Sequence, residues 1–182
     1  MKRDKSVTRK KLIEAFWSIY CEKDIGKITI KEITERSGHY RSTFYIHFLD
    51  VYDVLESIET EIIEEIVENL PTNIYAEMSE SFVDSIAKLY KANGAYISTL
   101  LGENGDPAFV DKLKKAIIPK VFPNLGEDNE GTYKRLIIEY NLSGILYTIK
   151  YWYENEQDLD SKSLLLLIRN IMRHGSLQEL IE

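Results

Sequence analysis

A short run of polar side chains at residues 40–47 carries the chemistry that stands out in this sequence. Arg41 offers a guanidinium, which is the best bidentate partner for the edge of a guanine. Thr29 stands where a helix is expected to begin, so that its hydroxyl and amide can be brought to a phosphate. The polar residues of the run are Tyr40, Arg41, Ser42, Thr43, Tyr45 and His47. Their groups suit hydrogen bonds to phosphates and to base edges.

Two short helices are expected to position these residues. Thr29 and Glu32 have the spacing of a capping box, in which each side chain accepts from the backbone amide of the other residue. The first helix follows with its isoleucines turned inward, and Gly38 ends it because glycine adopts the left-handed conformation at no steric cost. The second segment runs from Arg41 to Phe48, with Phe44 and Phe48 on one side as a small core.

Two short helices around a glycine turn form a helix-turn-helix. The second helix of such a unit fits the major groove of B-DNA, and residues in its first turn reach base edges. The pattern alone is not specific, since most helical hairpins contact no DNA. Asp50 then caps a longer helix, and Asp53 adds negative charge to its first turn.

The identity of the residues makes this case specific, because the run resembles the DNA-binding domain of the TetR family of bacterial transcriptional regulators. The resemblance extends over about the first 55 residues. The matching features are the turn at Gly38, the Thr43-Phe44-Tyr45 core of the recognition helix, the His47-Phe48 pair and the acidic helix start at Asp50. The family places Arg41 and Ser42 at positions that read bases, and Thr43 at one that contacts bases and phosphates. Tyr45 and His47 match positions that hold the DNA backbone.

Two positions depart from the family pattern. Tyr40 stands where a small polar cap is common, and its ring is either an added DNA contact or a surface group without a role. Val51 stands where the family often has a phosphate-binding lysine, so some affinity for DNA should be missing. His39 and His47 lie eight residues apart with no further ligand at suitable spacing, which favours solvent or phosphate contact over zinc.

The net charge of −7 is unevenly distributed. Residues 1–50 hold 11 Lys or Arg and 7 Asp or Glu, a net charge of +4, whereas residues 51–182 hold 12 and 23, a net charge of −11. A basic head on an acidic body suits a protein that presents one end to a polyanion. Cys21 is alone, which excludes an internal disulfide and favours a cytoplasmic protein, and no apolar run is long enough to span a membrane.

Helical periodicity continues through the whole chain, and we found no convincing strand pattern. A basic arm at residues 1–8 precedes the first helix, in which Cys21 is expected to fill a small gap. An apolar stripe predicts a helix over 50–69, with an acidic, solvated opposite face that includes Glu59 and with Pro71 ending the helix. Pro119, Pro123 and Gly126 are expected to interrupt the chain further on. The other expected helices cover residues 8–23, 79–92, 95–101, from Asp106-Pro107 onward, 130–154 and 161–174.

The C-terminal part shows no catalytic constellation, so we expect neither an enzyme nor a cofactor or metal site. Its conspicuous feature is tyrosine, which suits the wall of a pocket for an amphipathic ligand. Core or interface filling is the alternative for each of them. The pocket candidates are Tyr90, Tyr96 and Tyr140.

The last two helices indicate a homodimer, because they carry more apolar residues than one buried face needs. The expected interface residues are Leu136, Gly144, Thr148, Leu164, Ile168 and Ile171. In the family, two such helices from each chain close a four-helix bundle.

The sequence therefore predicts an all-α protein in two parts: an N-terminal three-helix helix-turn-helix domain at residues 1–50 and a larger C-terminal effector-binding and dimerisation domain at residues 51–182. The predicted function is a DNA-binding transcriptional regulator, a repressor released by a small-molecule effector, that binds a near-palindromic operator in double-stranded DNA. The alternative is a protein of the same shape that acts through protein partners as an activator or co-regulator, with weak DNA binding of its own.

Overall fold

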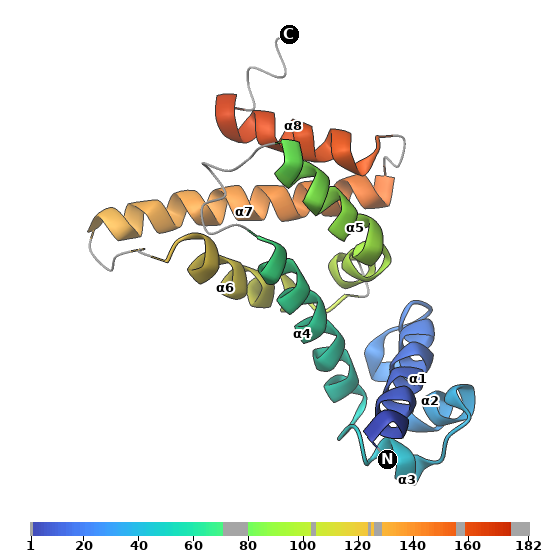
Figure 1. The fold of residues 1–182 in the computed structure, drawn as a ribbon. Coiled ribbons are helices and arrows are strands. Elements are labelled where there is room, and N and C mark those ends of the chain that lie inside the picture. Colours follow the sequence, from blue (N-terminus) through green and yellow to red (C-terminus); the bar gives the residue numbers. More distant parts are fainter. Residues whose placement is uncertain are drawn as a thin grey trace. The chain divides into compact units, whose positions relative to one another are not determined.

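The computed structural model describes residues 2–70, 80–102, 105–123, 125, 129–155 and 159–175. Within these ranges the regular structure is helical and contains no strand, so the all-α prediction is confirmed. The chain divides into two compact units, Met1–Ile62 and Ile63–Glu182 (Figure 1). The functional division after residue 50 stays a prediction.

The first unit contains α1 (Lys2–Tyr20), the short 3-10 turn η1 (Ile25–Lys27), α2 (Ile30–Ser37), α3 (Arg41–Phe44) and the first part of α4 (Val51–Asn69). Helix α2 packs against α1 and α3. Helix α1 begins at Lys2, so the predicted basic arm is wrong. No glycine or proline interrupts residues 2–20, and the helix continues through them.

The core of the first unit lies between α1, α2, α3 and the start of α4. Its most deeply buried apolar side chains are Leu12, Phe16, Tyr20, Ile33, Phe44 and Val54. Two residues differ from the prediction. Cys21 is exposed rather than a core filler, and Glu59, assigned to the solvated face of α4, is only 1% exposed. Residues 55, 58, 59 and 62 are all buried, so the buried stripe of α4 is wider than the apolar pattern alone indicates.

Arg9 connects α1 to α4. Its guanidinium forms an ion pair with Glu61 at 2.8 Å and also donates to the hydroxyl of Ser57. The guanidinium carbon lies 5.4 Å from the ring centre of Phe48, within the range of a cation–π contact. The segment that follows α3 is thereby attached to α1 as well as to its own helix.

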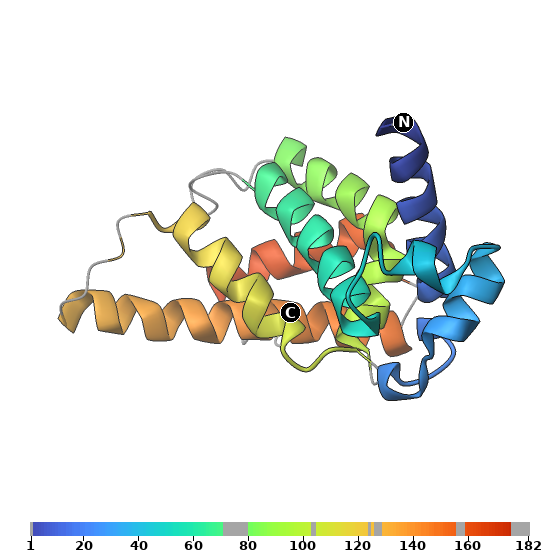
Figure 2. The same cartoon turned by 90° about the horizontal axis from the view of Figure 1, so that it is seen from below.

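The second unit contains α5 (Glu80–Leu101), α6 (Phe109–Val121), α7 (Asn129–Asn155) and α8 (Ser161–His174). Helix α5 packs against α6, α7 and α8, and α7 packs against α6 and α8 as well (Figure 1). Both Figure 1 and Figure 2 show α6 beside the N-terminal half of α7. The two predicted helices over 130–154 and 161–174 are therefore present as α7 and α8.

Two predicted helix breaks in this unit are absent. Residues 80–101 form the single helix α5, because Gly94 costs about 1 kcal/mol in a helix interior but does not end the helix. Pro119 lies inside α6. Its missing amide removes one hydrogen bond, and α6 ends two residues later at Val121. Pro71, expected to end α4, lies outside the described residues.

The turn between α5 and α6 is restricted sterically at Gly105 and by hydrogen bonds at Asp106. A Cβ at Gly105 would lie 2.0 Å from the Leu100 carbonyl oxygen, so no larger residue fits. Asp106 accepts from the Ala108 amide at 2.9 Å and from Lys112 Nζ at 2.8 Å. These bonds lie in the turn before α6. The cap residue of the helix itself is Ala108, which makes no side-chain capping hydrogen bond, and the helix begins at Phe109, so the predicted helix start at Asp106-Pro107 is wrong by two residues.

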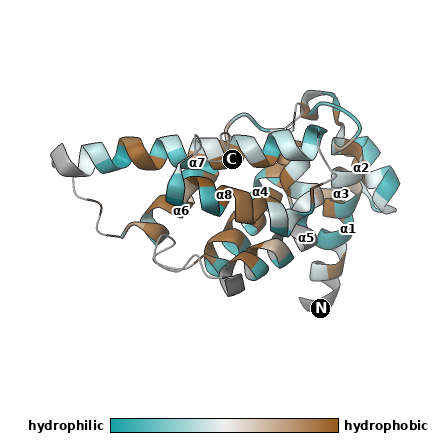
Figure 3. Ribbon diagram, turned by 90° about the horizontal axis from the view of Figure 1, so that it is seen from above, coloured by the Kyte–Doolittle hydropathy of each residue, from teal (hydrophilic) through white to brown (hydrophobic). Residues whose placement is uncertain are grey.

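Helix α7 has apolar residues on more than one side. Figure 3 shows hydrophobic and hydrophilic residues alternating along its length. None of the described helices combines the length and the apolar character that a membrane span requires.

Candidate nucleic-acid interface

The floor of the candidate interface is a small aromatic core. The rings of Phe44 and Phe48 are 5.7 Å apart and both are buried, as the i, i+4 spacing predicts. The ring of Tyr45 meets Phe44 edge-on at 5.7 Å. Because this floor is anchored in the core of the first unit, the other side of the segment is presented to solvent.

Four of the predicted contact residues lie on that exposed side: Tyr40, Arg41, Ser42 and Tyr45. Tyr40 is 82% exposed. The guanidinium of Arg41 donates to the hydroxyl of Tyr45 at 3.3 Å, one helical turn away. The structure thus brings a cation that can read a guanine beside a phenol that can hold a phosphate.

Tyr40 occupies the cap position of α3 without capping it through its side chain. Its carbonyl accepts from the amides of Thr43 at 2.9 Å and Phe44 at 3.2 Å, whereas its ring makes no capping hydrogen bond. A cap supplied by the backbone alone leaves the phenol available for another contact.

Thr43 and His47 are half-buried, and so lie partly behind the exposed residues. His39 is also half-buried, and its Nδ1 lies 2.8 Å from the carbonyl oxygen of Ser37. Across the described part of the chain, no three His, Cys, Asp or Glu side chains are grouped to hold a metal ion.

The predicted capping box at the start of α2 is present. The Thr29 amide donates to Glu32 at 2.9 Å, and the Thr29 hydroxyl accepts from the Glu32 amide at 3.3 Å. Lys23 Nζ lies 2.6 Å from the same carboxylate. The ion pair with Lys23 and the hydrogen bonds from Thr29 lower the pKa of Glu32 to about 2.

The capping box occupies the two Thr29 donors that are predicted to contact a phosphate. Its hydroxyl lies 2.8 Å from a Glu32 oxygen and its amide is bound to the same oxygen. A phosphate could use these two donors only by displacing a carboxylate that is ionised at neutral pH. The contact predicted for Thr29 therefore competes with the capping box.

The turn between α2 and α3 depends on Gly38. This residue has φ 70° and ψ 29°, the left-handed conformation predicted for the helix exit. The following amide, of His39, donates to the Thr34 carbonyl at 2.9 Å, which closes the end of α2. The direction of α3 relative to α2 is set by this turn.

The start of α4 is capped as expected. Asp50 accepts from the amides of Tyr52 at 2.8 Å and Asp53 at 3.0 Å, and Asp53 accepts from the Leu49 amide at 2.7 Å. Val51 is buried, so this position supports packing in the place where the family often has a phosphate-binding lysine.

Sequence reasoning missed two exposed apolar residues beside the polar ones. Ile46 and Leu49 are 64% and 81% exposed. Their signal was available, since both lie out of phase with the inward pair Phe44 and Phe48. On a DNA surface they could meet thymine methyl groups or sugars.

The predicted effector residues do not come together around a described cavity. Tyr140 is 79% exposed, and Tyr96 is half-buried. The side chain of Tyr90 lies outside the described part of the structure. Neither Tyr96 nor Tyr140 lines a described pocket of the second unit.

The predicted dimer residues fall into two groups. Leu136, Gly144 and Thr148 are exposed on α7. On α8, Leu164 and Ile168 are buried within the single chain and Ile171 is half-buried. The exposed apolar surface therefore lies on α7. Its large members are Tyr133, Leu136, Ile137, Tyr140, Tyr147 and Tyr151, which we call the α7 stripe.

Comparison with known proteins agrees with this architecture. The chain is similar in structure to a TetR transcriptional regulator from Streptococcus agalactiae 2603V, with a TM-score of 0.69 and 22% sequence identity over 93% of this chain and 96% of that one. No curated protein sequence matches the chain. Residues 77–174 match the family model TetR_C_8, described as a transcriptional regulator C-terminal region. Because that match extends over more than half of the sequence, the chain belongs to the TetR family of transcriptional regulators.

Proposed function

We propose that this regulator is a homodimer that binds a near-palindromic DNA operator and represses transcription until a small molecule binds its C-terminal unit. The observation that carries the DNA-binding part is the exposed set Tyr40, Arg41, Ser42 and Tyr45, held over the buried Phe44–Phe48 pair. Arg41 would read a guanine, and the phenol of Tyr45 would hold the adjacent backbone.

The homodimer is supported by the α7 stripe. Its members fall at positions 133, 136, 137, 140, 147 and 151, a spacing of three, four or seven residues around Ile137 and Tyr140, so they lie along one side of the helix. A single-chain protein rarely exposes so many large apolar residues together. A second copy packed on this stripe would bury them and allow the close approach that Gly144 permits. The two recognition helices would then read half-sites roughly 34 Å apart.

Repression relieved by a ligand is the default of the family, and it sets a condition on binding. If an effector weakens operator binding by a certain factor, the operator weakens effector binding by the same factor. The alternative is a regulator that works through protein partners. The buried Val51 favours it because the family's phosphate-binding lysine is missing at that position, and Tyr40 departs from the family's small polar cap as well.

The test is selection of bound sequences from random duplex DNA, followed by titration of the selected site at two salt concentrations. We expect a palindrome, an affinity that falls steeply with salt, and a loss of about 1–3 kcal/mol per half-site in Arg41→Ala. Lys27→Ala is the matched control, because it removes one positive charge from the η1 turn of the same unit.

Equal affinity of Arg41→Ala and the unchanged protein would contradict base reading by this residue. Absence of any enriched sequence would favour the protein-partner alternative.

A further inference from the structure

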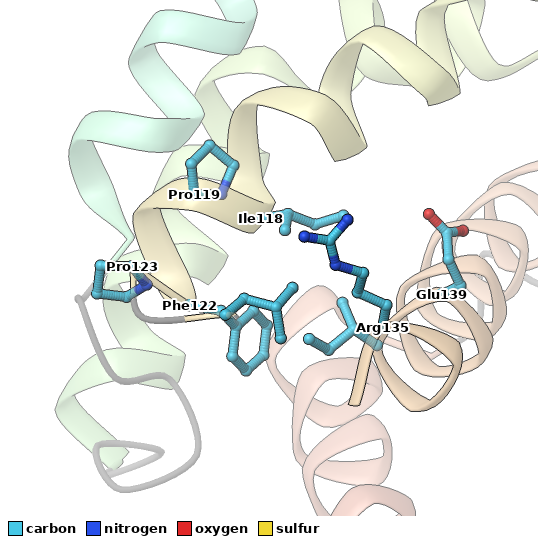
Figure 4. A pocket seen from close by; sticks show the side chains of 8 residues that line it. Ile118, Pro119, Phe122, Pro123, Arg135 and Glu139 are labelled. Atoms are coloured by element: carbon cyan, nitrogen blue, oxygen red, sulfur yellow. The ribbon is translucent and has the colours of Figure 1, made fainter. Parts of the chain in front are cut away.

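The second unit contains a cavity of about 450 Å³ between the C-terminal end of α6 and the N-terminal half of α7. We call it the α6–α7 pocket. Its lining is mostly apolar and includes Ile118, Pro119 and Phe122 from the α6 side and Arg135, Ile138 and Glu139 from α7 (Figure 4). The volume lies in the range of pockets that hold small organic molecules.

Arg135 is the unusual member of this lining. Figure 4 shows its guanidinium extending from α7 toward Ile118 of α6. Among the described side chains it has no ion-pair or hydrogen-bond partner. A guanidinium offers five donors in a planar fork that matches carboxylate and phosphate groups. Arg135 is exposed at the rim of the apolar cavity, so its donors are accessible to an anionic group of a ligand.

Glu139 does not serve as that partner, although it is one turn from Arg135 on the same helix. Its carboxylate is 2.8 Å from Lys114 Nζ, which also donates to the Ser143 hydroxyl at 2.8 Å. The Lys114 side chain is only 12% exposed, so this pair is held by its surroundings. The negative charge of Glu139 is thus already matched, and that of an incoming anion would be matched by Arg135.

The pocket lies on the other side of α7 from the α7 stripe. Residues of a helix advance by about 100° each, which places Arg135 and Ile138 roughly opposite Tyr133 and Tyr140. A second copy seated on the stripe would therefore leave the pocket open to solvent.

We propose that the α6–α7 pocket binds an organic anion with an apolar body, whose charged group is held by Arg135. The apolar body would lie against Ile118, Phe122 and Ile138. The binding site is argued from the cavity itself, whereas its regulatory meaning rests on the proposed function.

Calorimetric titration of the full chain with octanoate, octyl phosphate and octanol tests this assignment. We expect at least one of the two anions to bind more tightly than octanol. Arg135→Gln should weaken the binding of that anion about tenfold and leave octanol unchanged. Arg135→Lys should recover part of the loss, because it keeps the charge without the fork.

Two further variants sharpen the result. Lys115→Gln, on the exposed side of α6, removes the same charge outside the pocket and should change nothing. Ile118→Glu would supply an internal carboxylate beside Arg135 and should abolish anion binding. Circular dichroism checks that each variant is folded.

Equal binding of the anion by Arg135→Gln, or no binding of either anion to the folded unchanged protein, would overturn the assignment. Operator affinity is then measured with and without the bound anion. Binding that leaves operator affinity unchanged supports the site and contradicts the effector part of the proposed function.

Discussion

At the scale of single residues, the candidate DNA surface is organised by hydrogen bonds that hold neighbouring groups in place. Glu32 shows this most clearly, since its carboxylate joins Thr29 of the capping box to Lys23 in the turn after α1. The same carboxylate occupies the donors that a phosphate would use. Local stability and phosphate binding at Thr29 are therefore opposed at this position.

We predict that Glu32→Gln lowers the free energy of unfolding at neutral pH and makes it depend less on pH between about 2 and 4.3. The pKa of Glu32 is lowered to about 2 in the folded chain, below the value of about 4.3 expected in the unfolded chain. Its contribution is thus present above about pH 4.3 and is lost as the pH falls toward 2. Urea unfolding followed by circular dichroism between pH 2 and 7 measures both effects.

The control for this variant is Glu35→Gln, which removes a carboxylate with a longer ion pair, 3.8 Å from Lys31, on the same helix. Parallel pH profiles for Glu32→Gln and the unchanged protein would contradict the role assigned to Glu32.

At the scale of elements, the turns and caps determine where the recognition residues point. Helix α3 is only four residues long and could not be stable alone. It is held by Phe44 and Phe48 below, by the Gly38 turn before it and by the Asp50 cap after it. A fault at any of these three positions should disturb the exposed residues without touching them.

We predict that Gly38→Ala destabilises the first unit by about 1–2 kcal/mol, because a side chain is unfavourable at φ 70°. The affinity for the DNA site obtained by selection should fall as well. Gly26→Ala is the matched control, since a Cβ there meets nothing within 4 Å and the backbone is not left-handed. Chemical unfolding of both variants provides the comparison, and equal stabilities would show that the turn is not strained by a side chain.

The same elements explain how much the sequence could predict. The capping box, the exit at Gly38, the aromatic pair and the Asp50 cap each depend on a few neighbouring residues, and all four are present. The helical breaks at residues 93–94 and at Pro119 were wrong because packing in the second unit outweighs local preference. The burial of Glu59 departs from the polar pattern of α4, and the α6–α7 pocket is formed by two helices whose packing periodicity does not predict.

At the scale of the whole molecule, α7 links the proposed functions. One side of it faces α6 and lines the pocket through Arg135, and the other side exposes the α7 stripe. A ligand in the pocket and a partner on the stripe would thus act on the same helix. This arrangement offers a short route between effector binding and the geometry of the dimer.

We predict that Tyr140→Glu converts the proposed dimer to a monomer at micromolar concentration, because the variant places a charge in the centre of the α7 stripe. Leu136→Glu should also give a monomer. Lys115→Glu on α6 is the control for an added negative charge outside the stripe, and light scattering after size exclusion measures the mass. A dimer that survives both substitutions would place the interface elsewhere.

The α7 stripe has a consequence for how such a regulator responds to its own abundance. If the proposed dimer forms, most chains are monomers whenever the protein concentration is below the dissociation constant of the dimer. The dimer concentration then rises with the square of the total protein concentration. Operator occupancy would then change more steeply than protein level, and modest changes in synthesis would switch transcription. Because a dimer is stabilised by mass action, the unfolding temperature of this protein should also rise with its concentration.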